Sequence, residues 1–194
     1  DMHEYRKLTL RQKIGQTMLM LPDRKLEMEL GGGSLKGFFA RYPVSGFFMG
    51  WKLFDGVPPE RHADHIRNSA REYQAASELP LLFQEDYESG VGLPGMTPMP
   101  KLMALGAANS EELASAYGRH NGREAWSVGV KWVLNPVADL NVNPANPIVN
   151  TRGISDEPEL ASRLLARVIS GIQENGVAAT AKHSPGDGVD SRDQ

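Results

Sequence analysis

Three apolar stretches of this 194-residue sequence end in acidic or basic side chains or are followed directly by them. The groups are Glu85-Asp86, then Asp139, then Lys182-His183. If each apolar run is a strand of a parallel sheet, these side chains gather at the carboxyl ends of the strands, where the sites of α/β proteins form. An acid after a strand often only caps the next helix. Three such groups in succession, the last pair basic, favour a binding or catalytic site.

The strands that would position these groups are apolar runs without strict alternation, as expected when both faces of a sheet are covered. They span residues 44–51, 79–86, 130–140 and 177–181. Helices are predicted between them by apolar residues at helical spacing and by capping signals. They are a short helix after the Thr9/Gln12 capping box, residues 60–77, a helix capped by Asn109, and a long helix that begins at Ser155 or Asp156.

Strands that alternate with helices predict parallel βαβ units and therefore an α/β protein. Four such units fit either half of an eight-stranded barrel or a small open, doubly wound sheet. The pattern alone does not choose between these two architectures.

Composition excludes several classes of function. The sequence has no cysteine, which rules out disulfides, thiolate metal sites and cysteine nucleophiles. Its net charge of −3 gives no reason to expect a nucleic acid or an anionic membrane as partner. His62 and His65 lie three residues apart on a predicted helix, but further ligands for a metal are not evident, so no metal site and no cofactor are expected.

The residues from Lys182 to Gly188 read Lys-His-Ser-Pro-Gly-Asp-Gly. This stretch resembles the Lys-His-Phe-Pro-Gly-x-Gly signature of family 3 glycoside hydrolases, the family of β-glucosidases and β-N-acetylglucosaminidases. Residues 8–16, 84–90, 135–144 and 146–152 resemble the same family in the same order. Together these matches cover nearly the whole chain.

The resemblance implies a (β/α)8 barrel, of which this chain would supply about the first four βα units. It also implies a retaining double displacement at the anomeric carbon of a carbohydrate substrate. By similarity, Asp86 would accept hydrogen bonds from hydroxyls of the terminal sugar, and Arg152, Lys182 and His183 would donate to its oxygens. A carboxylate and a cation can satisfy one hydroxyl together, because a hydroxyl both donates and accepts.

In the N-acetylglucosaminidase-like branch, the proton donor is a His two residues after an Asp. Asp193 matches that Asp, and the His would be the residue after Gln194. We therefore expect residues 1–194 to be the N-terminal part of a single barrel domain, cut within the acid/base loop. The expected partner is the C-terminal half of the same barrel, which carries the nucleophile.

The resemblance leaves alternatives open. β-N-Acetylhexosaminidase is preferred over β-glucosidase because of Asp193, a phosphorylase is a variant, and a non-catalytic sugar-binding or scaffold domain is the second hypothesis. Ser184 stands where the family usually has Phe, and Asp187 stands where cell-wall-recycling members often have His. The compartment is left undecided.

Simpler roles are expected for several other residues. Asp139 is interpreted as structural rather than as a substrate contact, Glu88 as the support of a loop, and Arg152 as a possible ion-pair partner of Asp139 or Glu157. The tryptophans could stack on sugars, but their places in predicted strands and a helix favour the core. They are Trp51, Trp126 and Trp132.

Overall fold

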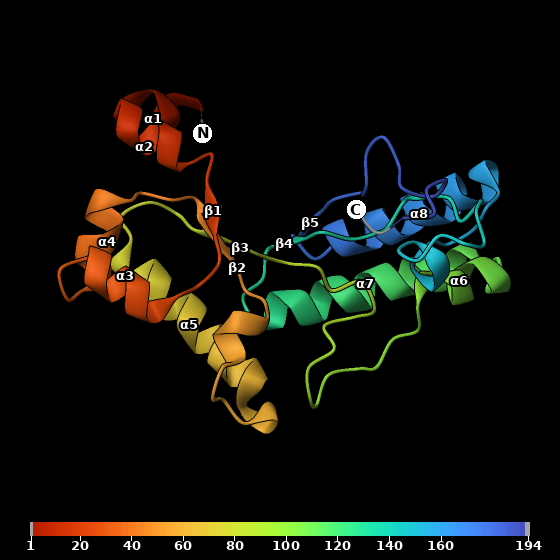
Figure 1. The fold of residues 1–194 in the computed structure, drawn as a ribbon, viewed down its shortest axis with the longest axis horizontal. Coiled ribbons are helices and arrows are strands. Elements are labelled where there is room, and N and C mark those ends of the chain that lie inside the picture. Colours follow the sequence, from red (N-terminus) through yellow and green to blue (C-terminus); the bar gives the residue numbers. More distant parts are fainter. Residues whose placement is uncertain (1, 193–194) are drawn as a thin grey trace. The chain divides into compact units, whose positions relative to one another are not determined.

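The structure is a computed structural model that describes residues 2–192 (Figure 1). The chain divides into two compact units, of which unit 1 ends at Glu85 and unit 2 begins at Asp86. Each unit is described by itself below.

Between residues 2 and 85, unit 1 contains three parallel strands in chain order, with helices between them. Its strands are β1 (Leu19–Met20), β2 (Gly46–Phe48) and β3 (Leu82–Glu85), with Gly46 opposite both Leu19 and Leu82. Its helices are α1 (Met2–Lys7), α2 (Leu10–Gly15), α3 (Arg24–Leu30), α4 (Leu35–Arg41) and α5 (His62–Ala76), with short 3-10 turns at Trp51–Phe54 and Pro59–Arg61.

The core of unit 1 is aromatic. Phe47 of β2 is fully buried, and its ring stacks on Tyr73 of α5 with 4.2 Å between ring centroids. Phe39 of α4 meets both rings edge to face. The α5 face that carries Ile66, Ala70 and Tyr73 is buried, which confirms the helix predicted from their spacing.

Over its described residues, 86–192, unit 2 contains a parallel strand pair and three α-helices. β4 (Trp132–Val133) pairs with β5 (Ala178–Ala179). The helices are α6 (Leu102–Ala108), α7 (Glu111–Ser127) and α8 (Pro158–Gln173), with a 3-10 turn at Asn150–Arg152.

Helices α7 and α8 run side by side and approach closely, as the green and blue ribbons of Figure 1 show. The approach depends on two glycines. A Cβ on Gly118 would collide with the carbonyl oxygen of Val168, and one on Gly171 would lie 2.6 Å from the carbonyl oxygen of Ser115. Glycine at both positions therefore lets one backbone lie against the other.

The structure confirms the predicted alternation of strands and helices but differs in detail. The described residues form five short parallel strands rather than four, because β1 was not predicted, and α1, α3, α4 and α6 were also missed. The strand predicted over residues 130–140 is shorter in the structure and consists of β4, since Pro136 has no N–H to donate to a neighbouring strand. The Thr9/Gln12 capping box is present. Asn109 ends α6 in the left-handed region, and Ser110 caps α7 instead.

The prediction that the tryptophans lie in the core is wrong for two of them. Trp51 is 68% exposed on a 3-10 turn, and Trp126 is 50% exposed at the end of α7, where the Lys131 ammonium lies over its ring. Trp132 is half-buried, and its indole N–H donates to Thr180 Oγ1 at 2.6 Å. Within residues 2–192, the helices are all too short or too polar to cross a bilayer.

Candidate functional site

The predicted binding residues lie together in unit 2. Asp86 and Glu88 follow β3 in the chain, Arg152 ends the 3-10 turn at Asn150–Arg152, and Lys182-His183 follow β5. Asp139 follows the segment after β4. Hydrogen bonds and ion pairs link these residues in two groups, one around Glu88 and one around Asp139.

Lys182 lies between two carboxylates. Its Nζ is 2.6 Å from Asp86 Oδ1 and 2.7 Å from Glu88 Oε1. The Lys182 side chain is 14% exposed and that of Glu88 15%, whereas that of Asp86 is 46% exposed. Asp86 is therefore the acid of this group that is most accessible from outside.

Arg152 completes the group around Glu88. Its Nε and Nη2 donate to the two oxygens of Glu88 at 2.8 Å each, and Nη1 donates to the carbonyl of Ile148 at 3.1 Å. Burial alone would raise the pKa of the Glu88 carboxyl, but the hydrogen bonds from Arg152 and Lys182 outweigh it and lower the pKa to about 2. The hydrogen bonds with Glu88 raise the pKa of Arg152. The Arg152 ion pair is thus made with Glu88, neither with Asp139 nor with Glu157.

The backbone between Asp86 and Glu88 is held in an uncommon conformation. Tyr87 has φ of 44°, a value that bulky residues rarely adopt. Its carbonyl accepts hydrogen bonds from Asn121 Nδ2 at 2.8 Å and Asn135 Nδ2 at 3.3 Å, and both amides are fully buried. The Tyr117 hydroxyl donates to the carbonyl of Glu88 at 2.8 Å. These contacts orient the Asp86 and Glu88 side chains toward Lys182.

The sequence interpretation missed these supporting residues. Tyr117 and Asn121 lie one turn apart on the buried face of α7. A polar residue on an otherwise apolar helix face was the signal in the sequence that could have indicated their supporting role. The left-handed conformation of Tyr87 has no such signal, because it is imposed by partners distant in sequence.

The second group is centred on Asp139, which is buried as expected of a structural residue. Its Oδ2 lies 2.6 Å from His183 Nδ1 and accepts from the His183 backbone N–H at 3.2 Å, and its Oδ1 accepts from the Asp187 backbone N–H at 2.8 Å. Burial would raise the pKa of the Asp139 carboxyl, but these bonds lower it. The carboxylate therefore stays charged and fixes both ends of the 183–187 turn.

Asp139, His183 and Asp187 lie close enough together to hold a metal ion, since their ligand atoms are all within 4.8 Å of one another. However, both oxygens of Asp139 already accept hydrogen bonds, and His183 Nδ1 is occupied by one of them. A cation there would have to displace these bonds, so the donor set fits a hydrogen-bonded turn better than a metal site.

The predicted catalytic residue Asp193 lies outside the described residues. The loop before it is held by two asparagines that the sequence interpretation did not single out. Asn146 Nδ2 donates to the carbonyls of Asp187 and Asp190 at 2.5 and 2.7 Å, and Asn143 Nδ2 donates to the carbonyl of Val189 at 3.0 Å.

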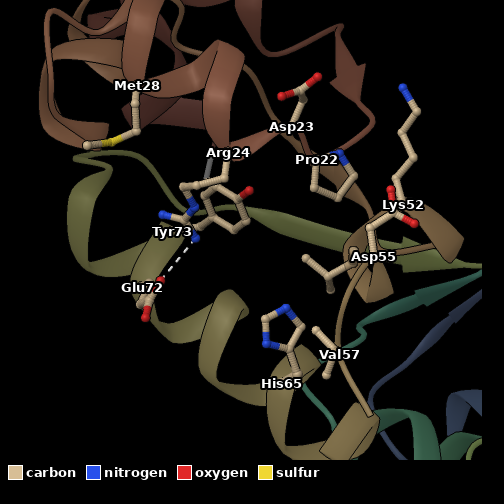
Figure 2. A pocket seen from close by; sticks show the side chains of 11 residues that line it. Pro22, Asp23, Arg24, Met28, Lys52, Asp55, Val57, His65, Glu72 and Tyr73 are labelled. Carbon is tan, nitrogen blue, oxygen red and sulfur yellow. Dashed lines mark hydrogen bonds and ion pairs between the residues drawn. The ribbon is translucent and has the colours of Figure 1, made fainter. Parts of the chain in front are cut away.

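Unit 1 contains a cavity of about 690 Å³ lined by residues that follow β1 and β2 and by α5. Figure 2 shows Arg24 and Glu72 paired at 3.0 Å on its wall, with Lys52, Asp55 and His65 around it. Tyr73 also lines this cavity, and its hydroxyl donates to both oxygens of buried Glu27 at 2.9 Å. Burial raises the pKa of the Glu27 carboxyl. Three carboxylates and two cations line it together with His65, and the predicted site residues within 2–192 are not part of this lining.

Comparison with known proteins finds a matching family and sequence relatives. The model of the "Glycosyl hydrolase family 3 N terminal domain" matches residues 9–194. A β-N-acetylglucosaminidase/β-glucosidase of Cellulomonas fimi is 37% identical over 123 residues, which cover 62% of this chain and 22% of the relative. β-Hexosaminidase A of Pseudoalteromonas piscicida is 30% identical over 188 residues, 93% of this chain and 31% of the relative.

Solved structures agree with this assignment. A glycoside hydrolase family 3 β-N-acetylglucosaminidase from Paenibacillus sp. str. FPU-7 matches with a TM-score of 0.78 and 31% identity, covering 96% of this chain and 35% of that one. A β-glucoside phosphorylase matches with a TM-score of 0.79 and 28% identity, covering 99% and 32%. The chain thus spans about a third of the length of these structures.

The fold class predicted from the sequence, α/β and part of a (β/α)8 barrel, is confirmed by these matches and by the parallel strands. The family match extends from the first capping box to the last residue of the chain. The chain belongs to glycosyl hydrolase family 3, in the N-terminal domain of that family.

Proposed function

We propose that the protein that carries this chain is an exo-acting retaining β-glycoside hydrolase, with β-N-acetylhexosaminidase activity preferred over β-glucosidase activity. In this proposal residues 1–194 are the N-terminal part of a single (β/α)8 domain, and the nucleophile comes from residues outside them. The full-length protein below means the polypeptide that contains both. The observation that carries the proposal is the group formed by Asp86, Glu88, Arg152 and Lys182.

That group is suited to holding one terminal sugar. Asp86 offers a half-exposed carboxylate as acceptor, and Lys182 offers an ammonium whose position is fixed by two acids. Arg152 and His183 keep 27% and 35% of their side chains exposed. Charge-assisted hydrogen bonds from such groups are stronger than neutral ones and are directional, so they fix how the sugar lies.

The reaction then follows the retaining scheme. The nucleophile forms a bond to the anomeric carbon while the bond to the leaving oxygen breaks, and a donor protonates that oxygen. The same donor next removes a proton from water, which attacks the anomeric carbon and releases the enzyme. We assign Asp193 to orient that donor, the His expected after Gln194, because His titrates near neutral pH and an Asp stabilises its charged form.

The test compares kcat/KM of the full-length protein for an aryl β-N-acetylglucosaminide and an aryl β-glucoside, and we expect the first to be higher. Asp193→Ala should lose most of this activity while the circular dichroism spectrum stays unchanged. Asp156→Ala, which removes an exposed acid two residues before α8, should keep full activity. Full activity of Asp193→Ala would show that the donor assignment is wrong, and sugar binding without turnover would favour a non-catalytic domain.

Phosphorolysis is the second candidate, favoured by the likeness to the β-glucoside phosphorylase structure. A His donor tolerates an anionic acceptor better than a carboxylate donor would. In that case inorganic phosphate replaces water in the second step and the product is a sugar 1-phosphate. Product analysis with and without phosphate separates the two reactions.

A further inference from the structure

We infer that Asp139 is a positioning residue that holds the proton of His183 on Nδ1 and thereby presents Nε2 to the substrate. The inference rests on the proposed function, in which His183 contacts the sugar. Asp139 is buried and does not reach the surface itself. In this inference it controls whether the His183 ring accepts or donates a hydrogen bond.

The first step is the protonation of Nδ1. Asp139 Oδ2 lies 2.6 Å from His183 Nδ1, and the hydrogen bonds that Asp139 accepts lower the pKa of its carboxyl. An ionised carboxylate can only accept hydrogen bonds, so the proton of this contact sits on Nδ1. Among residues 2–192, Nε2 meets no hydrogen-bond partner, and the ring keeps 35% of its surface exposed.

The second step is the consequence for Nε2. A neutral ring with its proton on Nδ1 has its lone pair on Nε2, which accepts a hydrogen bond from a sugar hydroxyl. A protonated ring donates from the same atom. Asp139 therefore makes Nε2 the atom that meets the sugar in both states, and it excludes the neutral ring that would donate from Nε2.

The third step is that a carboxylate is required at this position. Asp139 accepts three hydrogen bonds, two at Oδ2 and one at Oδ1. Asparagine has one acceptor oxygen and one NH2 donor. In one orientation of this amide, its NH2 would face the backbone N–H of Asp187. In the other, the NH2 would face the backbone N–H and the ring Nδ1 of His183. With the NH2 toward His183, it would donate to Nδ1 and move the ring proton to Nε2.

Asp187 provides the matched control. Its carboxylate Oδ2 lies 3.6 Å from His183 Nδ1, so it is a second negative charge beside the same atom. Its bond to Asp139, however, is made by the backbone N–H, which Asp187→Asn retains. Asp139→Asn and Asp187→Asn thus both remove one negative charge near the ring, but the first alone changes the acceptor that binds Nδ1.

The experiment is ¹⁵N NMR of the full-length protein labelled with [¹⁵N]histidine, at a pH where the ring is neutral. His183 is assigned by the signals that disappear in His183→Gln. We expect a protonated-type Nδ1 shift and a lone-pair-type Nε2 shift in the wild type and in Asp187→Asn, and at least a partial reversal of this pattern in Asp139→Asn. Asp139→Glu, which keeps a carboxylate, should restore the wild-type pattern at least in part.

Kinetics provide the second readout. Asp139→Asn should lower kcat/KM by about 10- to 100-fold, as the loss of an orienting partner typically does, and Asp187→Asn should stay within about threefold of the wild type. A wild-type spectrum with the proton on Nε2, or an unchanged proton position in Asp139→Asn, would overturn the inference. If Asp139→Asn fails to fold, the wild-type spectrum decides alone. The expected spectra without glycosidase turnover would leave the positioning role intact and reject the proposed function.

Discussion

The guanidinium of Arg152 and the carboxylate of Glu88 form a two-point ion pair, with both N–O distances at 2.8 Å. Lys182 Nζ adds a third donor to the same carboxylate at 2.7 Å. Glu88 is mostly buried, and its carbonyl is held in turn by Tyr117. One carboxylate therefore fixes the positions of two cations that come from distant parts of the chain.

The first prediction concerns Glu88→Gln. The glutamine amide has no charge to neutralise Arg152 and Lys182. Its NH2 group would also face an N–H donor where Glu88 has an acceptor oxygen, so a hydrogen bond is lost there. In the full-length protein, the free energy of unfolding in urea should fall by about 1–3 kcal/mol, and kcat/KM should fall by about 10- to 100-fold.

Glu111 supplies the control for that change, because it also bridges two arginines, Arg163 and Arg167, but on the surface. Glu111→Gln should leave kcat/KM unchanged and should alter stability far less, since exposed ion pairs contribute little. Equal effects of the two substitutions would contradict the central role of Glu88.

The second prediction is a dependence of stability on pH. Glu88 has a pKa of about 2 in the folded chain against an ordinary value of 4.5, so the unfolded chain binds its proton first as the pH falls. The stabilisation is complete above about pH 5 and is lost as the pH falls toward about 2, with a total of roughly 3 kcal/mol. Asp139 acts in the same direction, because its pKa is lowered too.

Urea unfolding of the wild type and of Glu88→Gln across this pH range provides the measurement. The variant should lose the Glu88 part of the acid dependence and keep the Asp139 part, so the two stability curves should converge as the pH falls. Parallel curves would mean that the Glu88 carboxyl titrates alike in the folded and unfolded chains.

The third prediction concerns Arg152→Lys. Lysine keeps the charge but offers a single ammonium, which cannot reproduce the planar two-point contact with Glu88. We expect kcat/KM of the full-length protein to fall by roughly tenfold, an estimate from the strength of one charge-assisted hydrogen bond. Arg163→Lys, at an exposed ion pair of α8, should have wild-type kinetics. An unchanged kcat/KM in Arg152→Lys would mean that charge alone suffices at this position.

Much of the site was predictable from the sequence because it follows the ends of strands. Asp86, Asp139 and Lys182-His183 were found from apolar runs that end in charged residues, and Arg152 from its resemblance to the family. The pairing among them was not predictable. Glu88 was interpreted as a loop support, but its role depends on residues that are brought to it by two later segments of the chain.

The missed elements of the fold have local reasons. Helices α3 and α4 lie in a charged, glycine-containing stretch that reads as loop, although Asp23 and Ser34 do cap them. Strand β1 has two residues, too few for any periodicity to be detected. Trp51 is the last residue of the strand predicted at 44–51, but the strand ends at Phe48, so the Trp51 side chain is exposed.

The fourth prediction concerns the support of the Tyr87 backbone. Asn121→Ala removes the closer of the two amide donors to the Tyr87 carbonyl and leaves the contact with Asn135 at 3.3 Å. The segment from Asp86 to Glu88 should then hold Lys182 less firmly. We expect stability to fall by about 1–3 kcal/mol and kcat/KM to fall severalfold.

Asn175→Ala is the control, because it removes a side-chain amide at another place and so separates the general effect of losing an amide from the effect of losing that of Asn121. Asn175 donates to the carbonyls of Arg119 and Gly171, at the junction of α7 and α8 and away from the carboxylates. It should lower stability in urea and leave kcat/KM unchanged. If both variants lose stability but neither loses activity, the Tyr87 backbone does not position the site.

The fifth prediction tests how closely α7 and α8 must approach. Gly→Ala inside a helix ordinarily stabilises it by about 1 kcal/mol. At Gly118, however, the added methyl would collide with the carbonyl of Val168, which is backbone and cannot turn away. Gly118→Ala should therefore lower the free energy of unfolding by about 1–3 kcal/mol, against the helix propensity. Arg119→Ala, at the next and exposed position, should leave stability nearly unchanged. A more stable Gly118→Ala would mean that the two helices can move apart without loss of packing.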